Sequence, residues 1–105
     1  MDEANLDLIF FSLSDKTRRG ILSHLSKNES TFGELAQKFT SSKQAISKHV
    51  SILEKAGFIK KEKNGRVCHC SFNPKPLNKV LNTVKDYKIY WEKQLGNLES
   101  FLDQL

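Results

Sequence analysis

The chain lacks any long hydrophobic run. Its 105 residues are 38% hydrophobic and 28% charged, and no apolar stretch approaches the roughly 20 residues that cross a bilayer. The first seven residues, Met1 to Asp7, are acidic and lack the basic segment that opens a secretory signal. We therefore expect one soluble domain in the cytoplasm, without membrane contact.

Cysteine is scarce as well. Cys68 and Cys70 are the only two in the sequence, and without an export signal we expect reduced thiols rather than a disulfide framework. The groupings that support catalysis are also missing: there is no nucleophile–base pair, phosphate-binding glycine loop, paired-carboxylate site or Cys/His set with zinc spacing. The sequence thus predicts neither an enzyme nor a bound cofactor.

Positive charge is concentrated in the middle of the chain. The net charge is +5, from 17 Lys/Arg and 12 Asp/Glu. Residues 31–74 contain eight of the basic residues and three of the acidic ones, so this segment accounts for the whole excess. Solubility gives no reason for such a concentration, whereas binding to a phosphate backbone does. The distribution favours double-stranded DNA as the partner.

Residues 31–57 have the pattern of two short helices joined by a tight polar turn. Thr31 and Glu34 are spaced as a capping box that starts the first helix. Residues 40–42 end that helix and offer an N-cap for the second, which Gly57 terminates. The second helix has an apolar face and a polar face: Ile46, Val50, Leu53 and Ala56 against Gln44, Ser47, Lys48, Ser51 and Lys55.

The polar face of this second helix suits a DNA major groove. Gln, Ser and Lys side chains have the size and the hydrogen-bonding groups to reach base edges and phosphates. The alternative is an ordinary solvated helix face. The short turn and the choice of polar residues favour a helix-turn-helix.

Two helices are predicted before this pair. Residues 6–13 form a short apolar helix, and Ser14–Asp15 caps a second helix over residues 16–25. After the pair, residues 58–72 form two extended segments on either side of Asn64–Gly65, which we expect to be the central residues of a type I′ hairpin turn.

The predicted hairpin has a basic tip, because Lys63 and Arg66 lie beside the turn. A helix-turn-helix followed directly by such a hairpin is a winged helix, whose wing lies along the DNA backbone or in the minor groove. We predict that Arg66 contacts a phosphate, and the alternative is a solvated loop charge.

The last thirty residues carry a heptad-like apolar repeat. Pro76 suits the first turn of a helix, which we expect over about residues 76–105. Such a helix is longer than the core of this domain requires, so we expect its seam to pack partly on the first helix and partly on a second copy of the chain. The alternative is a seam that folds back entirely on its own domain. The predicted dimer interface comprises Leu6, Trp91, Leu95, Leu98 and Leu102.

Three motifs resemble the ArsR family of bacterial winged-helix repressors. Leu13 to Leu22 is similar to the family's opening L-x-D-x-T-R-x-x-I-L, Ser47 to Gly57 to its recognition helix, and Gly65 to Pro74 to the end of its wing. The overall class is therefore mainly α with a small β-hairpin, a winged helix-turn-helix with a long C-terminal dimerisation helix. The resemblance implies a homodimer that represses transcription by occupying a palindromic operator.

The resemblance also implies a set of DNA contacts at the start and on the exposed face of the recognition helix and in the wing. They are Ser42, Lys43, Gln44, Ser47, Lys48, His49 and Arg66. His49 lies at the edge of the apolar stripe, so a phosphate contact and a hydrogen-bonded structural role are both open. For Arg18 and Arg19, in the opening motif, we expect ion pairs on the helix surface with Asp15 or another carboxylate.

The chain departs from the family at its two best-known metal sites. It has Leu35-Ala-Gln-Lys38 where many members have Cys-x-Cys, and no histidine follows His69, so metal induction through either site is not expected. Cys68 and Cys70 share one face of a predicted strand and remain as candidate ligands or redox thiols. We predict instead that they pack as small apolar side chains. The alternatives are a metal- or thiol-responsive repressor and a winged-helix protein-interaction module that binds no DNA.

Overall fold

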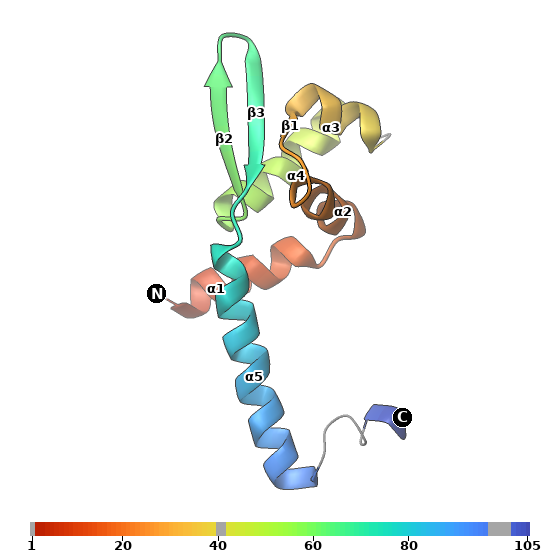
Figure 1. Ribbon diagram of the computed structural model, residues 1–105, viewed down its shortest axis with the longest axis vertical. Coiled ribbons are helices and arrows are strands. Elements are labelled where there is room, and N and C mark those ends of the chain that lie inside the picture. Colours follow the sequence, from red (N-terminus) through yellow and green to blue (C-terminus); the bar gives the residue numbers. More distant parts are fainter. Residues whose placement is uncertain (1, 40–41, 97–101) are drawn as a thin grey trace.

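The computed structural model describes residues 2–39, 42–96 and 102–105, with the side chains from Asn5 onward. The fold is mainly helical with a small antiparallel sheet, as predicted. Figure 1 shows the β2–β3 hairpin at one end of the molecule, α5 projecting at the other, and the remaining helices between them. The elements are α1 Asp2–Leu13, α2 Lys16–Leu25, β1 Ser30–Thr31, α3 Phe32–Lys38, α4 Lys43–Lys55, β2 Ile59–Asn64, β3 Val67–Phe72 and α5 Lys75–Leu95.

Side-chain caps fix where α2, α3 and α4 begin. Asp15 accepts a hydrogen bond from the backbone N–H three residues later, at 3.1 Å, and Ser42 does the same for α4 at 3.1 Å. The capping box at α3 is present in both directions: Glu34 N donates to Thr31 Oγ1 at 3.2 Å, and Thr31 N donates to Glu34 Oε1 at 2.8 Å. The predicted starts of these three helices are confirmed, and each cap satisfies a backbone N–H that the helix itself leaves free.

A single hydrophobic core lies between the helices and the base of the sheet. It takes one apolar face from each of α1 to α4 and the start of the hairpin. Its fully buried members include Ile9, Ile21, Leu35, Ile46, Val50, Leu53, Phe58 and Cys70. Because Ile46, Val50 and Leu53 all point into this core, the other side of α4 is left to solvent.

The sheet has a third strand that the sequence pattern did not predict. The strand order is β1-β3-β2, and β1 pairs Ser30 with Cys70 and Thr31 with His69. A two-residue strand carries no periodicity of its own, and this one forms because the chain between α2 and α3 passes along the free edge of β3.

The hairpin turn lies one residue later than predicted. Asn64 pairs with Val67, so the two-residue loop is Gly65–Arg66 and not Asn64–Gly65. Gly65 has φ +66°, the left-handed value that the first loop residue of a tight hairpin requires. The observed register also pairs buried Ile59 with Phe72 at the base of the hairpin, where both adjoin the core.

The C-terminal helix is shorter than predicted. α5 ends at Leu95 and Gly96 follows with φ +88°, so the expectation of one continuous helix over residues 76–105 is wrong at Gly96. The apolar repeat continues past this point in the sequence, but it gives no sign that Gly96 adopts a positive φ, which ends the helix. None of the helices in the described ranges combines the length and apolar content needed to span a membrane.

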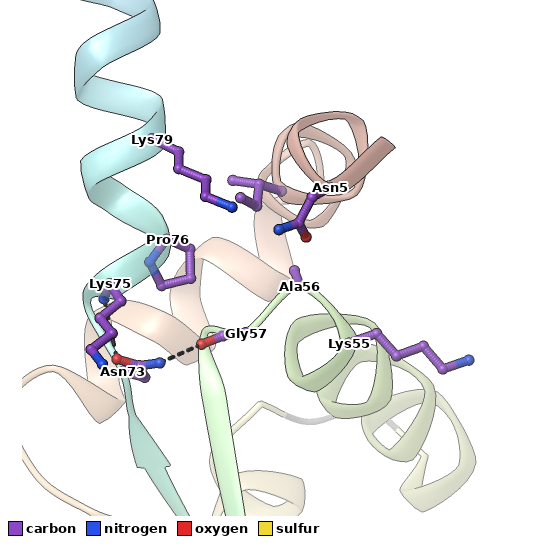
Figure 2. Close-up of a pocket in the computed structure, with 9 residues that line it drawn as sticks. Asn5, Lys55, Ala56, Gly57, Asn73, Lys75, Pro76 and Lys79 are labelled. Atoms are coloured by element: carbon purple, nitrogen blue, oxygen red, sulfur yellow. Dashed lines mark hydrogen bonds between the residues drawn. The ribbon is translucent and has the colours of Figure 1, made fainter. Parts of the chain in front are cut away.

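Asn73 joins the end of α4, the base of the hairpin and the start of α5 (Figure 2). Its Nδ2 donates to Gly57 O at 3.0 Å, its backbone N donates to Phe58 O at 2.8 Å, and its Oδ1 accepts from Lys75 N at 3.2 Å. Gly57 has φ +89°, and an added Cβ there would lie 3.3 Å from Pro76 Cγ. These contacts fix the position of the hairpin relative to α4.

Candidate nucleic-acid interface

The exposed face of α4 carries the predicted reading residues. Ser42, Lys43, Gln44, Ser47 and Lys48 are all exposed, while Ile46 and Val50, on the opposite face, are 0% and 1% exposed. Ser51, which the pattern places on the polar face, is half-buried, whereas Lys55 on the same face is exposed. The first two turns of α4 therefore present amide, hydroxyl and ammonium groups to solvent, the groups that read base edges and phosphates.

The hairpin adds positive charge beside this face. Lys61 forms an ion pair with Glu54 of α4 at 3.2 Å, which ties β2 to the helix. Lys63 and Arg66 are exposed at the tip, and no carboxylate in the described part of the chain forms an ion pair with either. Arg66 lies in the loop itself rather than beside it, at the extreme end of the hairpin.

Arg18 is not on the surface, which corrects the prediction of a surface ion pair. The residue is 6% exposed, and its guanidinium donates from Nε to Ser12 O at 2.9 Å and from Nη2 to Phe11 O at 3.0 Å. Arg19 is exposed, but its Nη1 donates to Leu13 O at 2.8 Å instead of pairing with a carboxylate. Both side chains satisfy carbonyls in the last turn of α1, where a positive charge also complements the helix dipole.

His49 faces Arg18. Its Nδ1 lies 3.2 Å from Arg18 Nη1 and 3.9 Å from Asp15 Oδ2, and its side chain is 21% exposed. The hydrogen bond from the backbone N–H of Arg18 lowers the pKa of Asp15 below its usual value. Of the two roles that the sequence left open, the hydrogen-bonded one has a partner in this structure.

Comparison with known proteins places this geometry in a family. Residues 13–62 match the model of a helix-turn-helix domain family. In Bacillus subtilis strain 168, the HTH-type transcriptional regulator YuzN is 40% identical over 84 residues, with 73% of this chain and 91% of YuzN covered. The transcriptional repressor SdpR of the same strain is 34% identical over 79 residues, with 75% and 88% covered.

Solved structures of ArsR-type regulators have the same fold. A crystal structure of an ArsR family transcriptional regulator superposes with a TM-score of 0.83 at 34% identity, with 88% of this chain and 95% of that chain covered. This chain belongs to the ArsR family. An ArsR-like regulator from Rhodococcus sp. RHA1 has a TM-score of 0.81 at 29% identity, with 97% and 94% covered. The chain is therefore a winged helix-turn-helix transcriptional regulator.

The two cysteines of this ArsR-family chain adjoin its core. Cys70 is fully buried, and burial raises the pKa of its thiol to about 11. Cys68 is half-buried and packs against the same core, and both thiols are free. Across the described residues, no three His, Cys, Asp or Glu side chains are grouped so that they could hold a metal ion. This placement favours packing over sensing, because a buried neutral thiol is a poor ligand and a poor nucleophile.

The predicted dimer residues are found in different environments. Leu6 is half-buried beside α5, Trp91 and Leu95 are each 44% exposed on α5, and Leu102 is 55% exposed. Leu98 lies outside the described residues. Leu81 and Val84 on the same seam are also exposed, whereas Leu77 at its start packs against the core. The seam therefore packs on its own domain only over the first turns of α5. Figure 1 shows α5 standing away from the other helices after its first turns.

The sequence pattern predicted Tyr87 as reinforcing the seam of α5 but missed two further exposed apolar side chains. Ile89 and Tyr90 are each more than half exposed, as is Tyr87, and Tyr90 meets the Trp91 ring edge-on at 5.6 Å between centroids. A heptad pattern registers one seam, whereas these residues make the second half of the helix apolar around much of its circumference.

Proposed function

We propose that this ArsR-family regulator is a homodimeric repressor that binds a palindromic operator in double-stranded DNA. The first turns of α4 enter the major groove, and the tip of the β2–β3 hairpin lies against the backbone of the same site. The observation that supports this most directly is the environment of α4. Lys43, Gln44, Ser47 and Lys48 are exposed on one face, and the opposite face is buried.

Similarity to SdpR favours repression over activation. SdpR, 34% identical to this chain, is a transcriptional repressor. A protein that covers its operator with two winged helices needs no further domain to block transcription from the site. As a DNA-binding regulator, the protein is proposed to act in the cytoplasm, without a cofactor.

Dimerisation through α5 is the arrangement that the exposed seam supports. Leu81, Val84, Trp91 and Leu95 offer a self-complementary apolar strip, and a second copy related by a two-fold axis would bury it. α5 and the hairpin lie at opposite ends of the molecule (Figure 1), so joining two copies along α5 leaves both reading surfaces free.

The competing hypothesis of a protein-interaction module fits the charge less well. Eight basic side chains against three acidic ones lie within residues 31–74, and the exposed tip of the hairpin is basic. Retention on random DNA separates the two: a DNA reader loses affinity steeply as salt rises, with a slope of about 0.9 per phosphate contact, and a protein adaptor does not.

Selection of bound duplexes from a random pool tests the proposal. We expect an inverted repeat whose half-site centres lie about one helical turn apart, roughly 34 Å along the DNA. A variant with Lys43→Glu and Lys48→Glu serves as the control, because both side chains are exposed and their loss leaves the core unchanged. Recovery of no common sequence would contradict operator binding, and recovery of a single unrepeated half-site would contradict the dimer.

A further inference from the structure

A guanidinium–imidazole contact lies directly behind the reading face of α4. Arg18 of α2 and His49 of α4 meet at 3.2 Å between Nη1 and Nδ1, at a point where Arg18 is 6% exposed. His49 directly follows Lys48 in the sequence. Any shift of the His49 backbone therefore moves the turn of α4 that carries Ser47 and Lys48.

The other donors of Arg18 are committed to α1. Nε donates to Ser12 O and Nη2 to Phe11 O, and the guanidinium carbon lies 4.9 Å from the centre of the Phe11 ring. These bonds hold the guanidinium flat against the last turn of α1 and leave Nη1 directed at His49. One buried side chain thus links α1, which packs on α5, with α4, which reads DNA.

The chemistry of the two groups fixes the state of the imidazole. A guanidinium carries N–H donors and no acceptor, so His49 Nδ1 must accept, and the ring proton must reside on Nε2. Asp15 Oδ2, at 3.9 Å from Nδ1, is too distant for a hydrogen bond, and it already accepts the Arg18 backbone N–H.

We propose that His49 is a positioning residue: through Nδ1 and Arg18 it sets the orientation of α4 against α1, and it makes no direct contact with DNA. The inference rests on the proposed function, because DNA affinity is one of its readouts. It goes beyond that function by giving His49 the role of holding α4 in position. It also names Arg18 as the contact that joins α4 to α1, which packs on α5.

A pair of substitutions separates the two nitrogens of the ring. Asn places its side-chain oxygen where Nδ1 lies, whereas Gln extends to the position of Nε2, and neither residue is charged. We expect His49→Asn to keep operator affinity within about threefold of wild type. We expect His49→Gln and the acceptor-free His49→Leu to lose about tenfold, because a small misplacement of a binding group is costly. Thermal unfolding of each variant shows whether it is folded.

The reverse ranking overturns the proposal. If His49→Gln binds the operator as well as wild type and His49→Asn does not, Nε2 contacts the DNA. An Arg18→Lys, His49→Leu double variant gives an independent check. If His49 acts through Arg18, the double variant is no weaker than the weaker single variant, and if the two losses multiply, the residues act separately.

The tautomer of His49 is measured without DNA. Nitrogen NMR of the free protein, assigned by the signal that His49→Asn removes, should show a ring proton on Nε2 and an unprotonated Nδ1 at neutral pH. A proton on Nδ1 overturns the proposal whatever the DNA result. A wild type that selects no duplex contradicts the proposed function instead, so the two failures are distinguishable.

Discussion

Residues two positions apart on α4 lie in opposite environments. Lys48 is exposed, and Val50 is 1% exposed within the core. Substitution of the first should therefore change binding with little change in stability, and substitution of the second should do the reverse. Such residues allow function and fold to be tested separately on one helix.

Lys48→Ala should weaken DNA binding and leave the free energy of unfolding nearly unchanged. If the ammonium contacts a phosphate, the slope of log affinity against log salt should fall by about 1, and if it contacts a base, sequence preference should relax at one position. Lys93→Ala is the matched control, because Lys93 is exposed on α5, far along the chain from the reading face. Equal affinities and slopes for wild type and Lys48→Ala would remove this residue from the interface.

Replacing both cysteines by serine should cost about 1–3 kcal/mol of unfolding free energy, because hydroxyls replace packed sulfur. Cys70 is buried and its thiol pKa is raised to about 11, and Cys68 packs against the same core, so we expect that neither soft metals nor mild oxidants release the wild-type protein from DNA. Gel-shift titration of both proteins with Zn²⁺, Cu(I) and diamide makes the measurement. Release seen with wild type alone would restore the sensor hypothesis.

At the scale of elements, local hydrogen bonds start the helices of the reading unit. The capping box of α3 has a pH signature, because the Thr31 backbone N–H lowers the pKa of Glu34 below its usual value of 4.5. A lowered folded-state pKa means that the ionised carboxylate stabilises the fold above the unfolded pKa. This stabilisation is lost as the pH falls through 4.5 and below.

Thr31→Ala should cost about 0.5–2 kcal/mol at neutral pH. Glu34→Gln keeps an acceptor but has no charge to titrate, so the stability difference from wild type should shrink as the pH falls below the usual value for glutamate. Denaturant unfolding at a series of pH values measures both effects. A difference that is constant down to pH 3 would show that Glu34 contributes no charge-dependent stability.

The hairpin tip depends on one backbone conformation. Gly65→Ala should destabilise the hairpin by about 1–2 kcal/mol, because φ is +66° there and an L side chain is strained in that region. An added Cβ would meet nothing within 4 Å, so the cost is conformational and not steric. Gly65→Asn should recover most of it, since Asn tolerates this conformation. Equal unfolding curves for the Ala and Asn variants would contradict this account.

At the scale of the whole molecule, the apolar and basic surfaces are separated. The basic hairpin and the reading face lie toward one end, and the exposed seam of α5 lies at the other (Figure 1). This separation is what a two-fold dimer on DNA needs, because each surface can then be buried without covering the other.

Trp91→Glu should therefore weaken the dimer by about 2 kcal/mol or more, which is about 30-fold in the dissociation constant. Operator affinity should fall with it, since the two half-sites no longer bind as one unit. Ile89→Glu is the matched control: Ile89 is 55% exposed and lies about 200° around the helix from Trp91. Sedimentation at micromolar concentration measures both variants. A Trp91→Glu variant that stays dimeric, or an Ile89→Glu variant that dissociates equally, would contradict this interface.

Much of the reading unit could be predicted from sequence because its signals are local. The Thr31–Glu34 capping box, the Ser42 cap and the apolar stripe of α4 are each encoded within a few residues, and all three were confirmed. The end of α5 and the exact turn were not. The seam continues past Gly96 in sequence, and Asn64–Gly65 and Gly65–Arg66 are both plausible loops until the register of β2 and β3 chooses between them.

The sequence by itself determined the helix-turn-helix, the basic hairpin and the family, because periodicity, capping and motif spacing act over short distances. Only the tertiary structure decided what Arg18, His49 and the β1 edge do, since their partners belong to other helices and strands. A guanidinium in an opening motif looks like a surface charge until α1 presents its last carbonyls and α4 presents Nδ1 at 3.2 Å. Hydrogen bonds between separate elements produce no periodic pattern in a sequence, so the contacts that hold α4 in position were found only in the folded structure.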